Sequence, residues 1–450
     1  MTIRSYVVAV TACLLVIGAA GYLASVPRIA LPLSAALLVG GATLRYAGWW
    51  RALVALAVVA SVARSGPLAS LLSASDWYAI QFGSLILAAV STLSSKPSRA
   101  ARSAGVLIAL WAWTAVCVAS TLWSVSPLNT IQQGGLLVAL VLFVSVTYHR
   151  RWTAETRLRG DLIWIAGVIS VPNSISLGAI ALHESWAYGY WTRGRGVYDN
   201  PNYLCVMAAF AGLTLISQTR PTSDRGLRSL AVVLVLINAG CVVLSASRGA
   251  SLGLLVGFGV LLMQRSSSRM ARRFLVGGIA AATVVILAFP TFANVGSLFS
   301  RSNQNSTDIT SGRTAIWGQI FAIWDQKPQF GWGYRSSDSL NLGQTGTLQA
   351  HNTLLTMLVE LGVLGFVAFT AFLVALFVSG RGNRVASIAP IIALIVTFEL
   401  TESSLIGIAG VTAIPFWLSL MSFGRGRLIA QDDQPDDKTR LRHASATIWA

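Results

Sequence analysis

The sequence predicts an all-α, polytopic membrane protein, because it is too apolar for a soluble domain and its apolar residues form long continuous runs. Charged residues make up 11% of the 450 positions and hydrophobic residues 54%, and the mean hydropathy is +0.66. A soluble domain carries about 25% charged residues. Many of the runs approach the length of about 20 residues that crosses a bilayer as a helix. They are continuous rather than alternating, which excludes a barrel and favours helices.

We predict about 14 transmembrane helices from these runs. The first also resembles a signal peptide, since Arg4 precedes its apolar stretch, but we expect it to be retained. The predicted spans are 5–25, 29–44, 51–66, 76–95, 103–122, 128–148, 159–181, 199–217, 229–246, 250–264, 274–291, 353–379, 386–402 and 406–422.

The basic residues predict the orientation of these spans. With a cytoplasmic N-terminus, 24 of the 33 Lys and Arg residues fall in inner loops and the tail, as the positive-inside rule expects. The net charge of +17 therefore reflects topology rather than nucleic-acid binding. Residues 1–424 form a single membrane domain with one long extracytoplasmic loop, 292–352, before the twelfth helix. Residues 425–450 form a polar cytoplasmic tail that we expect to be flexible.

Nine basic residues fall on the predicted outer side, where the topology gives them no role. We expect Arg28 and Arg64 to be ordinary solvated charges. The other seven all lie in three outer segments, 183–198, 247–249 and 292–350. The nine are Arg28, Arg64, Arg193, Arg195, Arg248, Arg301, Arg313, Lys327 and Arg335.

The first of these segments leads into the eighth predicted helix. Asn200 can cap that helix, and Pro201 suits its first position. Arg193 and Arg195 then lie near a helix N-terminus, which is a favourable place for an anion. A plain helix start beside interfacial arginines is the alternative, but capping does not explain the two arginines.

Arg248 lies in a very short turn between two apolar helices. A charge at membrane depth is costly unless it is paired or faces a cavity. Its guanidinium fork suits a phosphate group, which it can bind through two parallel hydrogen bonds.

The long outer loop contains its own predicted helix. Residues 314–324 carry apolar side chains at helical spacing and should lie on the membrane or on the helix bundle, with Arg313 at the beginning. Pro328 ends this helix, and Gly331 and Gly333 bend the chain after it. The predicted apolar face consists of Ile316, Trp317, Ile320, Phe321 and Trp324.

The loop ends at His351, directly before the twelfth helix, with Asn352 or Thr353 as its cap. A helix N-terminus disfavours a positively charged ring, and a neutral imidazole can accept a proton. A satisfied structural histidine is the alternative. Glu402 could orient His351 or pair with an outer arginine.

Acidic residues within predicted membrane helices are functional by default. Three meet that description here, although proton relays of transporters use such residues too. They are Glu360, Glu399 and Glu402.

The sequence contains no motif of soluble cofactor enzymes. There is no Walker loop, dinucleotide fingerprint, zinc spacing or outward Asp-x-Asp pair, so we expect no cofactor and no metal site. The energy of any reaction outside the membrane must then come with the substrate. The four cysteines lie in apolar runs and should be inert packing residues; they are Cys13, Cys117, Cys205 and Cys241.

These features together resemble the O-antigen ligase and polymerase superfamily over roughly residues 120–420. Each motif is weak singly, but their order and outward placement make the set specific. The motifs are 122–127 (LWSVSP), 195–202 (RGVYDNPN), 244–250 (LSASRGA), Gly312-Arg313 followed by Trp317, Pro328 and 331–333 (GWG), and His351-Asn352 followed by Glu360, Gly362 and Gly365.

The resemblance implies a glycosyltransferase at the periplasmic face of the bacterial inner membrane. The implied donor is a glycan on a polyprenyl pyrophosphate, usually undecaprenyl, and the acceptor a lipid or glycan hydroxyl, in a metal-independent, inverting reaction. Carried over to this sequence, Arg195 and Arg248 hold the pyrophosphate, with Arg313 as a further contact, and His351 is the general base. Asn200, Asn352 and Glu402 would support them. The ligases have about 12 helices, so the extra pair here is expected before the motif-bearing region.

Several alternatives remain open from the sequence. Ligase, polysaccharide polymerase and protein transferase share the donor, and the lack of a separate acceptor-binding domain favours the first two. An anion or small-solute transporter would explain the membrane acids, but it predicts internal repeats, and none is clear. A structural scaffold would tolerate replacement of Arg248 and His351.

Overall fold

A computed structural model describes most of the chain from Gly48 to Gly424 and confirms the all-helical fold class for those residues. The described ranges are 48–65, 69–93, 104–152, 155–189, 193–219, 225–266, 268, 313–340, 350–380 and 388–424. Within them no named strand occurs, and the one isolated bridge joins Tyr188 to Gly194.

The longer helices follow the predicted spans closely. They are α3 (Trp49–Ser65), α4 (Ala74–Thr92), α5 (Ala104–Ala119), α6 (Pro127–Val146), α7 (Glu155–Ala181), α8 (Pro201–Gln218), α9 (Arg225–Ser245), α10 (Arg248–Arg265), α12 (Arg313–Trp324), α13 (Thr353–Gly380), α14 (Ala389–Glu399) and α15 (Ala413–Phe423).

Five helical segments of the described part are long and apolar enough to cross a membrane. They are Ala104–Leu122, Pro127–Arg151, Arg157–Ala181, Arg225–Ser245 and Thr353–Gly380, while α14 and α15 are shorter apolar helices. The predicted spans 5–25, 29–44 and 274–291 lie outside the described residues, as does the tail 425–450. The count of 14 and the orientation therefore stay predictions. Two boundaries were wrong. The thirteenth span was expected to reach 402, but α14 ends at Glu399, and the fourteenth was expected to begin at 406, but α15 begins at Ala413.

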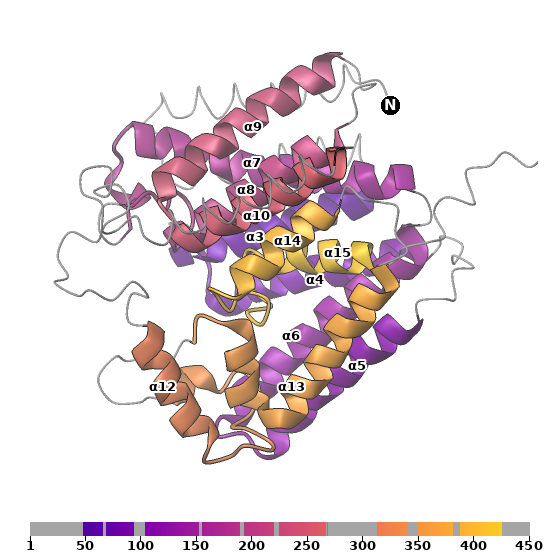
Figure 1. Ribbon diagram of the computed structural model, residues 1–450, viewed down its shortest axis with the longest axis vertical. Coiled ribbons are helices and arrows are strands. Elements are labelled where there is room, and N and C mark those ends of the chain that lie inside the picture. The colour runs from indigo at the N-terminus through magenta and orange to yellow at the C-terminus, as the bar shows by residue number, and fades with distance from the viewer. Residues whose placement is uncertain are drawn as a thin grey trace, which may run out of the picture.

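The helices form two groups joined by a third (Figure 1). α7, α8, α9 and α10 lie together on one side, and α5, α6 and α13 on the other, with α3, α4, α14 and α15 between them. α10 approaches α14 through a row of glycines at every fourth position. A Cβ atom on Gly253 would lie 3.0 Å from the carbonyl oxygen of Leu394, and one on Gly257 2.7 Å from that of Pro390. Small residues at this spacing let two membrane helices pack closely.

An aromatic cluster joins α5, α13 and α15. The ring centroid of Trp113 lies 5.2 Å from that of Phe369 and 5.8 Å from that of Trp417. Phe372 stacks on Trp417 at 5.7 Å. All four side chains are buried, so they fix how α13 sits in the bundle.

α13 is broken at Gly362, and the loop that precedes the helix fills the break. Gly362 has φ of 63°, in the left-handed region, so the helical ladder is interrupted there. The segment 328–333 supplies the missing partners: Val363 N donates to Pro328 O (2.8 Å), Leu364 N to Gln329 O (3.1 Å), Trp332 N to Val359 O (3.2 Å) and Gly333 N to Glu360 O (2.7 Å). Buried backbone groups must be paired, so loop and broken helix form one unit.

The predicted loop helix is confirmed as α12, which packs beside α13 (Figure 1). Ile320 and Ile323 are buried there, and Trp317 donates its indole N–H to Ala350 O at 2.9 Å. The predicted apolar face was wrong in one member, because Phe321 is 47% exposed and Ile323 takes the inner position. The predicted bends at Gly331 and Gly333 are confirmed by φ values of 65° and 106°.

Candidate active site

His351 lies between the end of the outer loop and the N-terminus of α13, and its ring contacts Glu402. The Nδ1 atom is 2.9 Å from Oε2 of Glu402. The histidine side chain is 31% exposed and that of Glu402 11%. The backbone of His351 has φ of 47°, an unusual value for a residue other than glycine. A carboxylate at Nδ1 favours the tautomer with its proton on that atom, which leaves the lone pair on Nε2.

Glu402 begins a chain of hydrogen bonds that joins three segments predicted to face outward. Its Oε1 accepts from Asn202 Nδ2 at 2.8 Å, and Asn202 Oδ1 accepts from Arg193 Nη2 at 3.0 Å. Arg193 Nε donates to the carbonyl of Ser245 at 2.9 Å. The loop before α8, the turn before α10 and the start of α13 therefore meet at one place.

Two asparagines fix the helix starts around this chain, as predicted. Asn200 caps α8 by accepting from Asn202 N at 2.8 Å. Asn352 caps α13 by accepting from the N–H groups of Leu354 and Leu355 at 3.0 and 3.1 Å. Asn352 also donates to Leu400 O at 3.1 Å, which holds the segment that carries Glu402.

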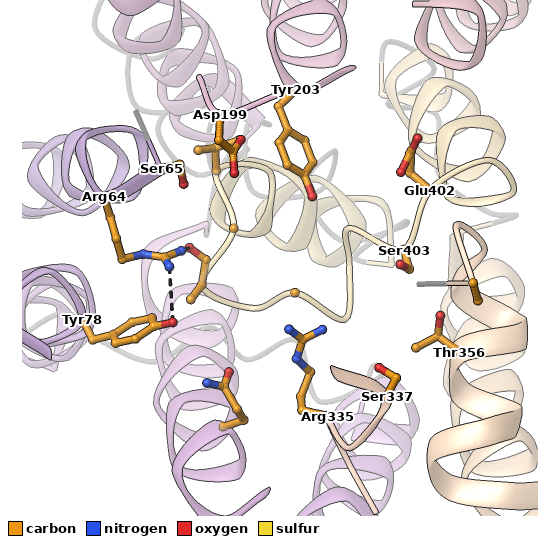
Figure 2. A pocket seen from close by; sticks show the side chains of 16 residues that line it. Arg64, Ser65, Tyr78, Asp199, Tyr203, Arg335, Ser337, Thr356, Glu402 and Ser403 are labelled. Carbon is orange, nitrogen blue, oxygen red and sulfur yellow. Dashed lines mark hydrogen bonds between the residues drawn. The ribbon is translucent and has the colours of Figure 1, made fainter. Parts of the chain in front are cut away.

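A polar cavity opens beside Glu402 (Figure 2). It encloses about 930 Å³, including open solvent at its mouth. Hydroxyl, amide, carboxyl and guanidinium groups dominate its wall. The lining residues are Arg64, Ser65, Tyr78, Gln133, Asp199, Tyr203, Arg335, Ser337, Ala350, Thr356, Glu402, Ser403, Gly407, Ala409, Gly410 and Val411.

Arg335 points its guanidinium group toward the middle of this cavity (Figure 2). Its backbone N–H donates to Oε2 of Glu360 at 2.8 Å, and its carbonyl accepts from Asn129 Nδ2 at 2.8 Å. The neighbouring Tyr334 is fixed in the same way: its N–H donates to Ser120 Oγ at 2.9 Å. These contacts hold Arg335 at φ of 58°, so its position is set by the fold rather than by a flexible loop.

Arg195 does not line the cavity, but its charge acts on Asp199, which does. Its Nε donates to Trp186 O at 3.1 Å. Burial raises the pKa of the Asp199 carboxyl above its usual range, and local backbone hydrogen bonds and the charges of Arg64 and Arg195 oppose the rise. Asp199 as a whole residue is exposed, but its carboxyl group faces the cavity, where the surrounding wall limits its contact with water (Figure 2).

Arg64 was expected to be an ordinary solvated charge, and this was wrong. It is half-buried in the cavity wall, where Nη1 donates to the Tyr78 hydroxyl at 3.3 Å and Nη2 to Ala409 O at 2.5 Å. Its guanidinium carbon also lies 4.6 Å from the centre of the Tyr78 ring.

The other two predicted arginines do not line the cavity. Arg248 is the half-buried first residue of α10, three residues after Ser245, whose carbonyl Arg193 contacts. Arg313 is the first residue of α12, as predicted, and its side chain lies outside the described residues. The structure thus brings the segments of Arg195, Arg248 and His351 together but leaves the pyrophosphate-binding role of the arginines as a prediction.

The two other membrane acids act as structural anchors in the described part of the chain. Glu360 accepts from Arg335 N and, at 2.6 Å, from Ser337 Oγ. Glu399 accepts from the hydroxyls of Thr353 and Ser404 and from Leu405 N. Both hold the loops around the cavity. Among the described residues, no group of three or more His, Cys, Asp or Glu side chains is placed to bind a metal ion.

Sequence reasoning missed the residues that shape the cavity itself. Arg64 and Arg335 were among the nine basic residues predicted on the outer side, and that unexpected placement was the only feature of the sequence that could have identified them. Asp199 and Asn202 stood within the 195–202 motif but looked like parts of a helix start. Tyr203 sits one position further, on α8, and carries no pattern that would distinguish it from an interfacial tyrosine.

Comparison with protein families gives one match in this region. Residues 231–370 match the family model described as O-antigen ligase. The match runs from α9 into α13 and includes Arg248, Arg313 and His351, whereas Arg195 and Glu402 lie outside it. The comparison with curated proteins gives no match. The family match over residues 231–370 and the apolar helical fold support a membrane protein that is similar to the O-antigen ligases.

Proposed function

We propose that the chain transfers a glycan from a polyprenyl pyrophosphate to an acceptor hydroxyl at the extracytoplasmic face of the bacterial inner membrane, as an O-antigen ligase. The observation that carries the proposal is the pair of His351 and Glu402, 2.9 Å apart at the edge of a polar cavity. The family match supports a glycosyltransferase of the ligase or polymerase type.

His351 serves as the general base. With Nδ1 turned to Glu402, Nε2 takes the proton of the acceptor hydroxyl as that oxygen attacks the anomeric carbon. Glu402 stabilises the positive charge that the ring gains, in the way the carboxylate of a hydrolase triad does. General-base catalysis contributes about 10²–10⁴-fold to a rate.

Arg195 and Arg248 bind the pyrophosphate leaving group. Negative charge grows on it as the glycosidic bond breaks, and fixed guanidinium groups stabilise that charge. Arg193 supports this role, because its bond to Ser245 O ties the loop of Arg195 to the turn before Arg248. Arg313 is a further contact to the same group. The donor stays in the bilayer, so arginines at helix starts lie at a suitable depth.

The positions of several helix ends support a single outward-facing site. The end of α3, the starts of α8, α10 and α13 and the segment after α14 meet around the cavity and the hydrogen-bond chain. These are the ends that the positive-inside rule places outside. A polymerase would use the same site with a growing glycan as acceptor.

The test is transfer from a polyprenyl-pyrophosphate glycan to a lipid acceptor by the full chain in liposomes. We expect His351→Ala to lower the rate by at least about 10²-fold, and Arg195→Ala and Arg248→Ala by about 10²–10³-fold each. His149→Ala is the matched control, since His149 lies in the turn after α6, away from the cavity. A chelator should leave transfer unchanged.

Two results would overturn the proposal. One is normal transfer by folded His351→Ala protein, which would remove the base. The other is solute flux through the liposomes with no glycan transfer, which would favour a transporter. A product that lengthens by repeated units instead of joining once to lipid would identify a polymerase.

A further inference from the structure

The cavity beside Glu402 has the chemistry of a sugar site. Among the described residues, six hydroxyl-bearing side chains line it, together with one amide and no Leu, Ile, Phe or Trp. A polyprenyl chain would leave these polar groups unpaired, which is costly, whereas a sugar can hydrogen-bond with them. The hydroxyl-bearing residues are Ser65, Tyr78, Tyr203, Ser337, Thr356 and Ser403.

Of the two carboxylates in the wall, that of Glu402 is held in place by other groups. Both oxygens of Glu402 are engaged, one by Asn202 and one by His351. Asp199 lies in the field of Arg64 and Arg195. The Glu402 carboxylate is therefore already hydrogen-bonded, and the charge of Asp199 is balanced in part by two arginines.

Arg335 faces the middle of the cavity, and the hydroxyl of Tyr203 points into the same space from the opposite wall (Figure 2). Asn129 and Glu360 hold the backbone of Arg335, so its side chain starts from a fixed position on the cavity wall. A guanidinium fork matches a planar carboxylate through two parallel hydrogen bonds.

We infer that Arg335 makes this cavity specific for an acidic sugar, by binding the carboxylate of a hexuronic acid beside the His351–Glu402 pair. The inference rests on the proposed function, which places a glycan in the cavity. Phosphate is the less suitable anion, because Arg195 and Arg248, proposed to hold the pyrophosphate, do not line the cavity.

Binding of two small glycosides, which differ in one carboxylate, tests the inference without any transfer reaction. The probes are methyl glucuronide and methyl glucoside, added to the full-length protein in detergent and followed by saturation-transfer NMR. We expect wild type to prefer the glucuronide by at least about tenfold, the size of a charged hydrogen bond. Arg335→Gln should lower that preference to near one.

Two further variants separate recognition from folding. Arg335→Gly removes the guanidinium but suits the left-handed backbone at this position, so it should fold and also lose the preference. Arg265→Gln removes a charge at the last residue of α10, and this variant should keep the preference for the glucuronide. A wild-type protein that binds both probes equally, or a preference that survives in Arg335→Gln, would overturn the inference.

Transfer assays identify which anion Arg335 binds. Donors that carry a terminal uronic acid or its carboxamide are compared in wild type and Arg335→Gln. A loss confined to the acidic donor supports the inference, whereas an equal loss with both would assign Arg335 to the pyrophosphate and overturn it. If no donor is transferred by wild type but the glucuronide preference holds, the proposed function fails and the sugar site stands.

Discussion

Glu402 lies 2.9 Å from Nδ1 of His351, although 51 residues separate them in the sequence. The contact exists because Asn352 binds Leu400 O and Glu399 binds Thr353, so the segment after α14 is fastened to the start of α13 twice. The hydrogen bond between Glu402 and His351 is a third contact between the same two segments, and it is the one that involves the proposed base. Its contribution can therefore be separated from the fold.

We predict that Glu402→Gln lowers kcat with little change in KM. Glutamine keeps the size and one hydrogen bond but cannot stabilise a positive imidazole, and loss of such a carboxylate costs up to about 10⁴-fold in triad enzymes. Initial rates at several acceptor concentrations check this. A rise in KM with unchanged kcat would show that Glu402 binds substrate and does not assist the base.

The polar link behind Glu402 gives a second prediction. Asn202→Asp places a second carboxylate 2.8 Å from Glu402 and removes the donor that orients it. We expect this variant to have a lower kcat. Asn202→Ser keeps a smaller hydrogen-bond donor and should retain a larger share of the wild-type kcat. Thermal unfolding of both variants is the control, because equal losses of stability and activity would indicate a merely structural role.

Much of the fold could be predicted because hydropathy decides where membrane helices lie. The spans of the described region, the caps Asn200 and Asn352 and the helix after Arg313 follow from local patterns. The cavity could not be predicted, since it depends on how distant segments pack. Glu360 illustrates the limit: its sequence position indicates a functional acid, but only packing reveals that it holds the backbone of Arg335.

The break in α13 gives a prediction about stability. Gly362→Ala should destabilise the protein strongly, because the residue has φ of 63° and an added Cβ atom would strike the backbone of Gln329. The segment 328–333 would then be displaced, and Arg335 with it. We expect a lower Tm and loss of transfer, measured on detergent-solubilised protein. An unchanged Tm would show that the loop does not depend on the break.

Asp199 gives a pH-dependent prediction. Burial raises the pKa of its carboxyl above the unfolded value, so the folded state binds the proton more tightly than the unfolded state. The stability that this residue contributes is present below the unfolded pKa and is lost as the pH rises through the folded pKa. Asp199→Asn should therefore lose less Tm than wild type between about pH 4 and pH 7. Parallel Tm curves would contradict the assignment.

The contact between α10 and α14 can be tested with a single methyl group. A Cβ atom on Gly257 would lie 2.7 Å from both Pro390 O and a methyl of Leu213, so Gly257→Ala forces the helices apart. Overpacking of this kind costs about 1–3 kcal/mol. Gly167→Ala is the matched control, because nothing lies within 4 Å of its added methyl group on α7. That variant should be stabilised by about 0.5–1 kcal/mol, since alanine favours a helix. Unfolding in a denaturant series compares the two. If Gly257→Ala is as stable as the control, α10 does not pack against α14 as closely as the glycine row requires, and the position of Arg248 at the start of α10 would have to be revised with it.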